Sequence, residues 1–245
     1  MIDIKEHEEL SRLNHSCAHM MAQAVKRLYP QAKFWVGPVI SEGFYYDIDL
    51  GDEVIKEEDL AKIEKEMKKI AKDGKRIVRK EISKEEALEM FQNDPYKIDL
   101  ISDLEDGTIT CYQQGEFIDL CRGPHVDTVK QLKNFKLLKH SGAYWKGDAS
   151  NKMLQRIYGI CFPTAEELED HLHLLEEAKK RDHKKLGREL GLFMMSEFAP
   201  GMPFFLPNGM IIRNLLENFW YEEHTKENYQ FIKTPIMMSK ELWEV

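Results

Sequence analysis

The N-terminal part of the chain carries an apolar stripe with helical spacing. Between residues 9 and 29, apolar side chains recur three or four positions apart, at Leu10, Leu13, Cys17, Met20, Met21, Ala24 and Leu28. This spacing predicts a helix that packs one face against a core. The other side carries His15, His19, Ala22 and Lys26. Two imidazoles beside small side chains on that side indicate the wall of a cleft.

Hydrophobic periodicity predicts further short elements up to residue 163. A charged-surface helix is expected at 56–73, and another begins at Ser83, which forms a capping box with Glu86. Alternating patterns between Gly and Pro breaks predict strands, at 33–40, 43–49, 76–82, 109–112, 117–121, 135–139 and 153–162. Helices interleaved with hairpin-like strands favour an α+β fold with an antiparallel sheet and surface helices.

The composition changes after residue 163. Thr164 and Glu167 form a second capping box, which predicts a long helix to about residue 190. The following segment is rich in Phe, Met, Pro and Gly, and it predicts a helix at 210–228 and a strand at 231–238. The sequence thus predicts three parts, namely a domain at 1–163, a linker helix at 164–190 and the start of a second domain at 191–245.

Two paired signatures lie about a hundred residues apart, HxxxH at His15 and His19 and CxxxH at Cys121 and His125. Histidines four apart share one side of a helix. Gly123-Pro124 excludes a helix around the second pair, and the preceding strand places Asp119 and Cys121 on one face. We therefore expect one composite site, against the plainer interpretation of an edge strand with a buried thiol.

Three kinds of chemistry suit this set of side chains. Three histidines and a cysteine match a tetrahedral zinc site, either closed and structural or open and catalytic. A cysteine beside a histidine can instead act as nucleophile and base. A metal-free cleft, in which imidazoles and a carboxylate orient substrate and water, is the third. Spacing alone leaves all three open.

Charge and composition narrow the class of protein. A formal charge of −8 on 245 residues argues against a basic nucleic-acid coat, so a polyanionic partner must be bound locally. The segment 178–188 is rich in basic residues. This pattern is typical of a solvated helix face, and the alternative interpretation is an edge that contacts phosphate groups. We expect a cytoplasmic protein without membrane contact, because no long apolar run, leader or compact disulfide spacing occurs.

Several stretches resemble bacterial-type threonyl-tRNA synthetases. HSCAHMMAQAVKRLYP, GPVISEGFYYDID, DLCRGPHV, SGAYWKGDASNKMLQRIYG and KRDHKKLGRELGLF are similar to that family's editing domain and linker helix, and 209–238 to the first class II motif. HxxxH with CxxxH also occurs in alanyl-type editing domains. The family's ubiquitin-like domain would precede Met1, and the motifs that bind ATP, Mg and the catalytic-domain zinc would follow Val245. The resemblance therefore implies a chain that edits without activating amino acids and needs no cofactor.

The resemblance also implies roles for individual residues. His15, His19, Cys121 and His125 would form the catalytic cleft, with Asp119 engaging the substrate's amino or hydroxyl group and Tyr46 and Lys97 completing the site. Taken alone, Lys97 would be assigned to the surface and Tyr46 to strand packing. We expect Cys121 to be a wall of the cleft rather than a nucleophile, and no metal ion in the site.

The implied substrate is seryl-tRNA(Thr), bound at the tRNA(Thr) acceptor end and hydrolysed to serine and tRNA. The first class II motif would allow a homodimer. The rival interpretations are a zinc-dependent, alanyl-type trans-editing deacylase and a non-catalytic tRNA-binding module.

Overall fold

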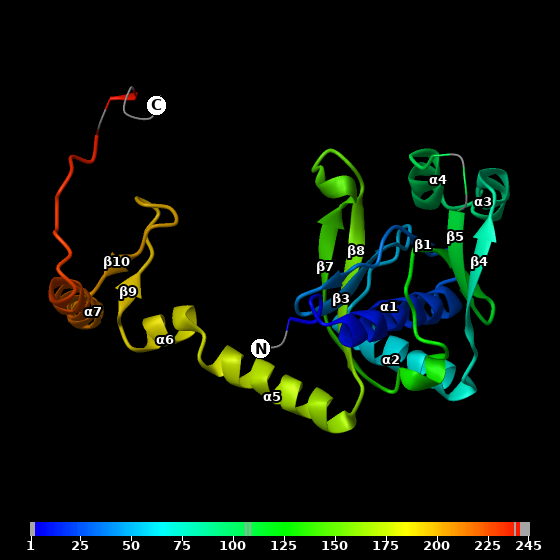
Figure 1. Cartoon of the computed structure of the whole chain (residues 1–245), viewed down its shortest axis with the longest axis horizontal. Helices are drawn as coiled ribbons and strands as arrows, with labels where there is room; N and C mark the ends of the chain where they lie inside the picture. Colours follow the sequence, from blue (N-terminus) through cyan, green and yellow to red (C-terminus); the bar gives the residue numbers. More distant parts are fainter. Residues whose placement is uncertain (1–2, 106, 108, 238, 241–245) are drawn as a thin grey trace. The chain divides into compact units, whose positions relative to one another are not determined.

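A computed structural model describes residues 3–105, 107, 109–237 and 239–240. The chain forms two compact units, residues 1–172 and 173–245 (Figure 1). The elements of the first unit, in chain order, are α1 (Glu8–Leu28), β1 (Lys33–Phe34), β2 (Val39–Ile40), β3 (Gly43–Asp49), α2 (Glu57–Asp73), β4 (Ile77–Ile82), α3 (Lys84–Met90), α4 (Pro95–Ser102), β5 (Ile109–Gln114), β6 (Phe117–Leu120), the 3₁₀ turns Val129–Gln131 and Trp145–Gly147, β7 (Asn134–Tyr144), β8 (Met153–Phe162) and the start of α5 (Ala165–Lys180).

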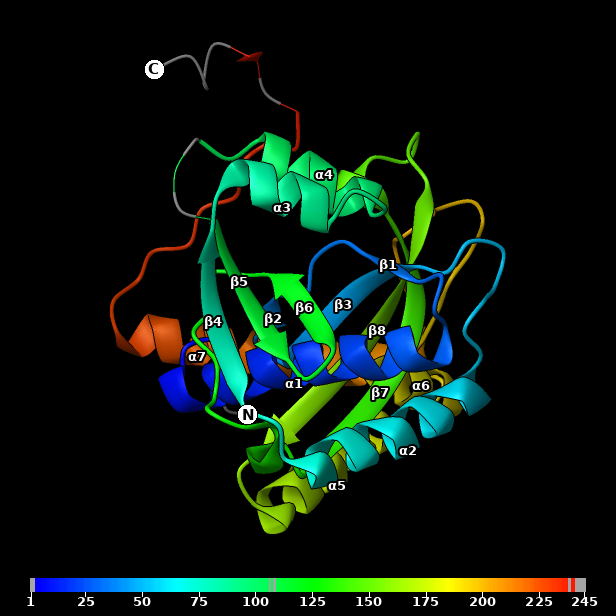
Figure 2. The same ribbon diagram turned by 90° about the vertical axis from the view of Figure 1, so that its right-hand side faces the viewer.

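The main sheet is antiparallel, in the order β1-β3-β8-β7 with β2 also paired to β3. Helices α1 and α2 run across one face of it (Figure 2). The main core lies between them and includes Met21, Ile63 and Ile157, each fully buried. Asn14 fastens α1 to the sheet, because its side-chain amide donates to the Cys161 carbonyl and accepts from the Cys161 N–H, both at 2.9 Å.

A second antiparallel sheet, β4-β5-β6, separates two apolar cores. Phe117 belongs to the main core, while Ile118 and Leu120 face a smaller core formed with α3 and α4. The hairpin between β5 and β6 turns at Gly115, whose φ of 58° favours glycine. The alternation along β6 therefore points Asp119 toward α1 and the main core, on the side expected from the sequence.

The predicted α+β class, with antiparallel strands and surface helices, is confirmed for the first unit. Both capping boxes, at Ser83 and Thr164, are present. The strands form two sheets rather than one, and the strand expected at 33–40 is split into two pairs around an irregular 35–38. Pro38 lacks the N–H that a continuous ladder needs.

The single helix expected at 164–190 is wrong. The chain leaves the helix after Lys180, and a second helix, α6 (His183–Glu189), begins beyond Asp182. The Asp182 carboxylate accepts a hydrogen bond from the Lys185 N–H at 2.9 Å and so caps α6. Aspartate competes for backbone hydrogen bonds in this way and favours a new helix start over continuation.

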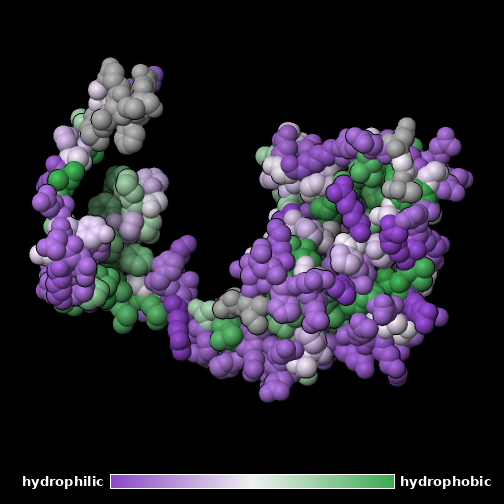
Figure 3. Space-filling view, viewed as in Figure 1, coloured by the Kyte–Doolittle hydropathy of each residue, from purple (hydrophilic) through white to green (hydrophobic). Residues whose placement is uncertain are grey.

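The second unit adds the short pair β9 (Phe193–Met194) and β10 (Phe204–Phe205), followed by α7 (Pro207–Lys226). The strand expected at 231–238 is wrong over 231–237, since no described segment pairs with it there, and Met238 lies outside the described residues. Helix α7 exposes large apolar side chains, among them Leu215, Leu216 and Phe219, and apolar surface is visible over this unit (Figure 3). Among the described helices, none is long and apolar enough to cross a membrane.

Candidate active site

The structure brings the HxxxH and CxxxH side chains together. Helix α1 presents His15 and His19 one turn apart, and the loop after β6 presents Cys121 and His125 against them. One ligand-type atom from each residue lies within 4.8 Å of those of the other three. The loop between Cys121 and His125 contains the cis Gly123–Pro124 bond.

The outer part of the site consists of Cys121, His15 and His125. The Cys121 Sγ lies 3.2 Å from the Nε2 atoms of both imidazoles, and the two rings stack with centroids 4.3 Å apart. The Nδ1 of His15 faces the Pro124 carbonyl at 3.3 Å. A carbonyl only accepts, so this contact requires the proton on Nδ1 and leaves Nε2 as an acceptor toward the thiol.

Ser16 orients His125 in a similar way. The Ser16 hydroxyl donates to the Arg12 carbonyl at 2.8 Å and lies 3.1 Å from the Nδ1 of His125. Because the single hydroxyl hydrogen is directed at the carbonyl, Nδ1 is the donor to Ser16 Oγ and Nε2 carries the lone pair. Both outer imidazoles thus direct an acceptor nitrogen toward Cys121. Burial raises the pKa of this thiol to about 12, so it is a neutral S–H at physiological pH.

The inner part of the site is a buried polar network. Lys97 is 3 % exposed and Asp119 is 1 % exposed, and their Nζ and Oδ1 atoms lie 2.5 Å apart. The Lys97 ammonium also donates to the Trp35 carbonyl at 3.0 Å and to the Tyr46 hydroxyl at 3.3 Å. Tyr46 in turn donates to the other oxygen of Asp119, and His19 Nε2 lies 3.8 Å from that oxygen.

Lys97 reaches this position because α4 is tied to the main sheet. The Asp94 carboxylate caps α4, accepting from the Tyr96 N–H at 3.1 Å, and it also accepts from the Phe34 N–H of β1 at 2.9 Å. The Tyr96 hydroxyl donates to Asp49 of β3 at 2.6 Å. The surface position that residue-by-residue reasoning assigned to Lys97 is therefore wrong, because docking of α4 onto β1 and β3 buries it.

A local signal for α4 was present in the sequence. Asp94 followed by Pro95 is the combination of an N-cap and a proline at the first helical position. Tyr96 and Asp49, which hold α4 in place, were not predicted, because neither carries a spacing pattern. Tyr46 was correctly placed on a strand, but its hydroxyl also belongs to the polar network.

Burial sets the protonation state of the histidines. Loss of solvent is the largest cause that lowers the pKa of His15, His19 and His125, and His15 and Lys97 lower that of His19 further. The three imidazoles are therefore neutral at pH 7, and each keeps an unprotonated ring nitrogen that can accept a hydrogen bond. Such a cluster beside a fixed cation and carboxylate can position a water molecule and a polar substrate.

These lowered pKa values predict a pH dependence of stability. At acid pH the histidines of the unfolded chain bind protons, whereas the folded histidines stay neutral because their pKa values are lowered. Their contribution to the free energy of unfolding is therefore complete above pH 6.5, the ordinary histidine pKa, and is lost as the pH falls below it. We expect the free energy of unfolding in urea to decrease from pH 7 to pH 5, by up to about 1.4 kcal/mol per pH unit for each histidine. His19→Gln should reduce this slope, because the pKa of His19 is lowered well below its ordinary value. An unchanged slope in His19→Gln would contradict the assignment.

Comparison with known proteins shows two kinds of similarity. Residues 109–158 match the family model described as the threonyl and alanyl tRNA synthetase second additional domain. Threonine–tRNA ligase from Syntrophomonas wolfei subsp. wolfei is 54 % identical over 100 % of this chain and 39 % of its own length. The Clostridioides difficile and Clostridium tetani enzymes of the same name are 56 % and 51 % identical, over 98 % and 99 % of this chain. The chain thus spans about 38 to 40 % of these relatives.

Proposed function

The chain belongs to the threonyl-tRNA synthetase family, and we propose that its histidine–cysteine site performs editing, hydrolysing seryl-tRNA(Thr) to serine and tRNA. The observation that carries the proposal is the cluster of three neutral imidazoles and Cys121 next to the buried pair Lys97–Asp119, which His19 contacts. The similarity to threonine–tRNA ligases supports the choice of a tRNA ester as substrate.

A synthetase for threonine needs such a second site for a physical reason. Serine lacks only the methyl group of threonine, and a binding pocket discriminates one methylene by about 1 to 3 kcal/mol. That margin leaves misacylation with serine too frequent for accurate translation. A separate cleft that admits the smaller seryl group and excludes the threonyl group corrects the error after transfer.

The inner network supplies groups that suit a seryl ester. In the proposed complex, the substrate's ammonium or hydroxyl group binds Asp119, in exchange for one of that carboxylate's present donors. The Lys97 ammonium, held by three oxygen atoms, stabilises the negative charge that develops on the ester oxygen. Its fixed position means that little reorganisation accompanies the reaction.

The outer imidazoles suit the attacking water. His15 and His125 each direct an unprotonated Nε2 toward Cys121, and because the thiol has only one hydrogen to donate, the other Nε2 can accept a hydrogen bond from the attacking water. The Cys121 thiol is protonated, which makes it a poor nucleophile. We assign it to the wall that crowds the extra methyl group of threonine.

Recognition of the tRNA itself is proposed to involve few contacts. The acceptor end would bring the ester to the cleft, and the basic segment 178–188 is a candidate for phosphate contacts. The exposed apolar side chains of α7, including Leu215 and Phe219, suit the pairing of two copies of the chain.

Substrate selectivity tests this proposal directly. The whole chain should release serine from seryl-tRNA(Thr) at least tenfold faster than threonine from threonyl-tRNA(Thr), because one methyl in a tight cleft costs about 1 to 3 kcal/mol. Cys121→Ala should narrow this ratio, by admitting threonine, and should retain serine release. Loss of serine release in Cys121→Ala would indicate a thiol nucleophile, and equal rates on both esters in the unchanged chain would refute a selective cleft.

Zinc-dependent hydrolysis is the rival mechanism that the side chains favour most. His15, His19, Cys121 and His125 fit zinc by type and by convergence, and the Nδ1 contacts of His15 and His125 resemble those that orient metal-bound histidines. In that case the ion would polarise the ester or activate the water. Zinc binding would have to displace the proton of the Cys121 thiol, whereas the buried Lys97–Asp119 pair already supplies a fixed cation for the ester.

We therefore expect deacylation of seryl-tRNA(Thr) to proceed at an unchanged rate after prolonged dialysis against a chelator. Elemental analysis of the purified chain should give well below one zinc per chain. One zinc per chain, with activity lost on chelation and restored by zinc, would establish the rival mechanism instead. Binding of tRNA without release of serine under any of these conditions would favour a non-catalytic module.

A further inference from the structure

The segment 141–159 is one of the stretches that are similar to threonyl-tRNA synthetases, yet the proposed reaction uses none of its residues. It forms the end of β7, the turn 145–152 and the first part of β8. The turn is held together from within, because the Trp145 carbonyl accepts hydrogen bonds from the Asp148 N–H at 3.3 Å and from the Asn151 side-chain amide at 3.1 Å. A turn fixed in this way can hold its side chains against a neighbouring element.

Trp145 packs this turn against α4. Its ring lies edge-on to the buried ring of Tyr96, with centroids 5.3 Å apart and an interplanar angle of 86°. The indole Nε1 is buried and has no hydrogen-bond partner within the described part of the chain. A buried donor without a partner is unfavourable. The packing of the two rings, rather than a hydrogen bond of the indole, therefore holds Trp145 in place.

Two lysines of the same segment add ionic contacts. The Lys146 ammonium donates to the Asp99 carboxylate of α4 at 2.8 Å. The Lys152 ammonium pairs at 2.8 Å with Asp49 of β3, the carboxylate that also accepts a hydrogen bond from the Tyr96 hydroxyl. The turn thus contacts α4 at Tyr96 and again, three residues later, at Asp99.

The spacing of these contacts limits rotation of α4. Lys97 follows Tyr96 directly and projects about 100° around the helix from it. Contacts in the first turn of a helix fix where the helix begins, whereas a further contact at Asp99 also restrains rotation about the helix axis. Rotation would carry the Lys97 ammonium away from the Asp119 carboxylate, with which it is paired.

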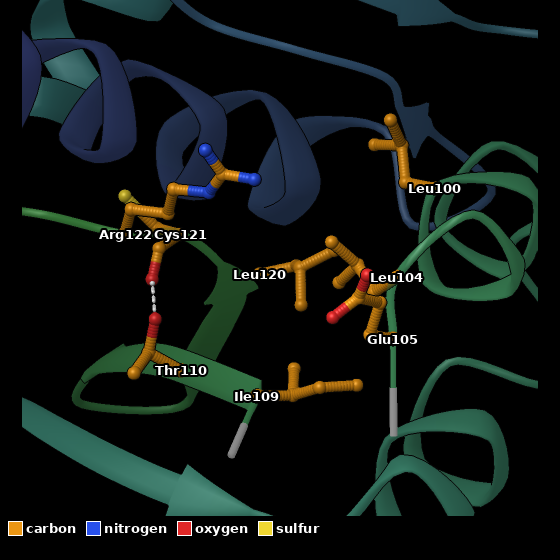
Figure 4. Close-up of a pocket in the computed structure, with 8 residues that line it drawn as sticks. All are labelled: Leu100, Leu104, Glu105, Ile109, Thr110, Leu120, Cys121 and Arg122. Carbon is orange, nitrogen blue, oxygen red and sulfur yellow. Dashed lines mark hydrogen bonds between the residues drawn. The ribbon is translucent and has the colours of Figure 1, made fainter. Parts of the chain in front are cut away.

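Packing at the other end of α4 provides less restraint. Toward its C-terminal end, the helix borders a cavity of about 440 Å³. Figure 4 shows this space between Leu100 and Leu104 on one side and Ile109 and Leu120 of β5 and β6 on the other. Side chains that line a cavity lack packed neighbours on that side, so they resist displacement less. The orientation of α4 therefore depends more strongly on the β7–β8 turn.

We infer that the β7–β8 turn is a positioning element of the proposed deacylase, in which Trp145 and Lys146 hold α4 so that the Lys97 ammonium stays directed at the ester. The inference rests on the proposed function and adds residues outside the cleft that act through Lys97. Trp145 is the main positioning residue, because the partly exposed pair Lys146–Asp99 contributes less on its own.

The test measures kcat and KM for release of serine from seryl-tRNA(Thr) by the whole chain. Trp145→Ala should lower kcat at least about tenfold, because a displacement of about 1 Å can cost on the order of 100-fold in rate. KM should stay within about twofold, since Lys97 acts on charge that develops only during the reaction. Trp145→Phe keeps a ring against Tyr96 and should retain most of the activity. Lys146→Met should lower kcat about two- to fivefold.

Two controls separate positioning from a general effect on the fold. Lys139→Met removes an exposed lysine of β7 that lies over the Tyr158 ring of β8, and it should change neither kcat nor KM. In the variant Lys97→Met/Asp119→Asn, adding Trp145→Ala should cause no further loss of the rate that remains, because the turn acts through Lys97. A merely structural role would reduce the rate by the same factor in both backgrounds.

The outcomes separate the inference from the function on which it rests. An unchanged kcat in Trp145→Ala, a loss confined to KM, or equal losses in the two backgrounds would overturn the positioning role while leaving the deacylase intact. If urea unfolding shows that Trp145→Ala does not fold, the same comparisons apply to Lys146→Met. Failure of the unchanged chain to release serine would overturn both the function and the inference.

Discussion

The ion pair between Lys97 and Asp119 is the interaction on which the rest of the site depends. Both side chains are almost completely buried, and an unpaired charge at such a position would be strongly unfavourable. Removal of one partner from a buried pair typically costs about 3 to 5 kcal/mol. The fold must therefore deliver both residues together, one from α4 and one from β6.

The arrangement of the first unit follows from this requirement. Helix α4 is held at two points, by Asp94 to β1 and by Tyr96 to Asp49 of β3, so that Lys97 projects over the main sheet. Strand β6 lies between two cores, and its alternation directs Asp119 inward. Helix α1, fastened by Asn14, then closes the site with His15 and His19. The two sheets thus meet where the charges are paired.

The same burial explains the neutrality of the outer groups. Low solvent access lowers the pKa of the three imidazoles and raises that of the Cys121 thiol. The charged pair Lys97–Asp119 then lies beside neutral imidazoles, whose unprotonated ring nitrogens can accept hydrogen bonds. In the proposed deacylation, such a cleft favours attack by a positioned water, with the charged pair directing the ester.

Local patterns in the sequence predicted part of this site. Helical spacing identified α1 and put both histidines on one side of it, and strand alternation put Asp119 and Cys121 on one face. Lys97 was recognised only through family resemblance, because its burial depends on contacts of α4 with β1 and β3 that no local pattern encodes. Outside the site, hydrophobic periodicity did not reveal the helix break at Asp182, where a single side chain caps a new helix. It also predicted a strand from Phe231 onward, but no described segment pairs with the chain there.

Single-turnover deacylation of seryl-tRNA(Thr) by the double variant Lys97→Met/Asp119→Asn tests the central role of the ion pair most directly. Neutralising both partners removes the unpaired charge that either single change would leave, so circular dichroism should report an intact fold. The account predicts a rate at least about 100-fold below that of the unchanged chain, the usual loss when a positioned electrostatic group is removed. Lys62→Met, which removes the exposed lysine that pairs with Asp59 on α2, should keep full activity. A folded double variant that releases serine within threefold of the unchanged rate would contradict the account.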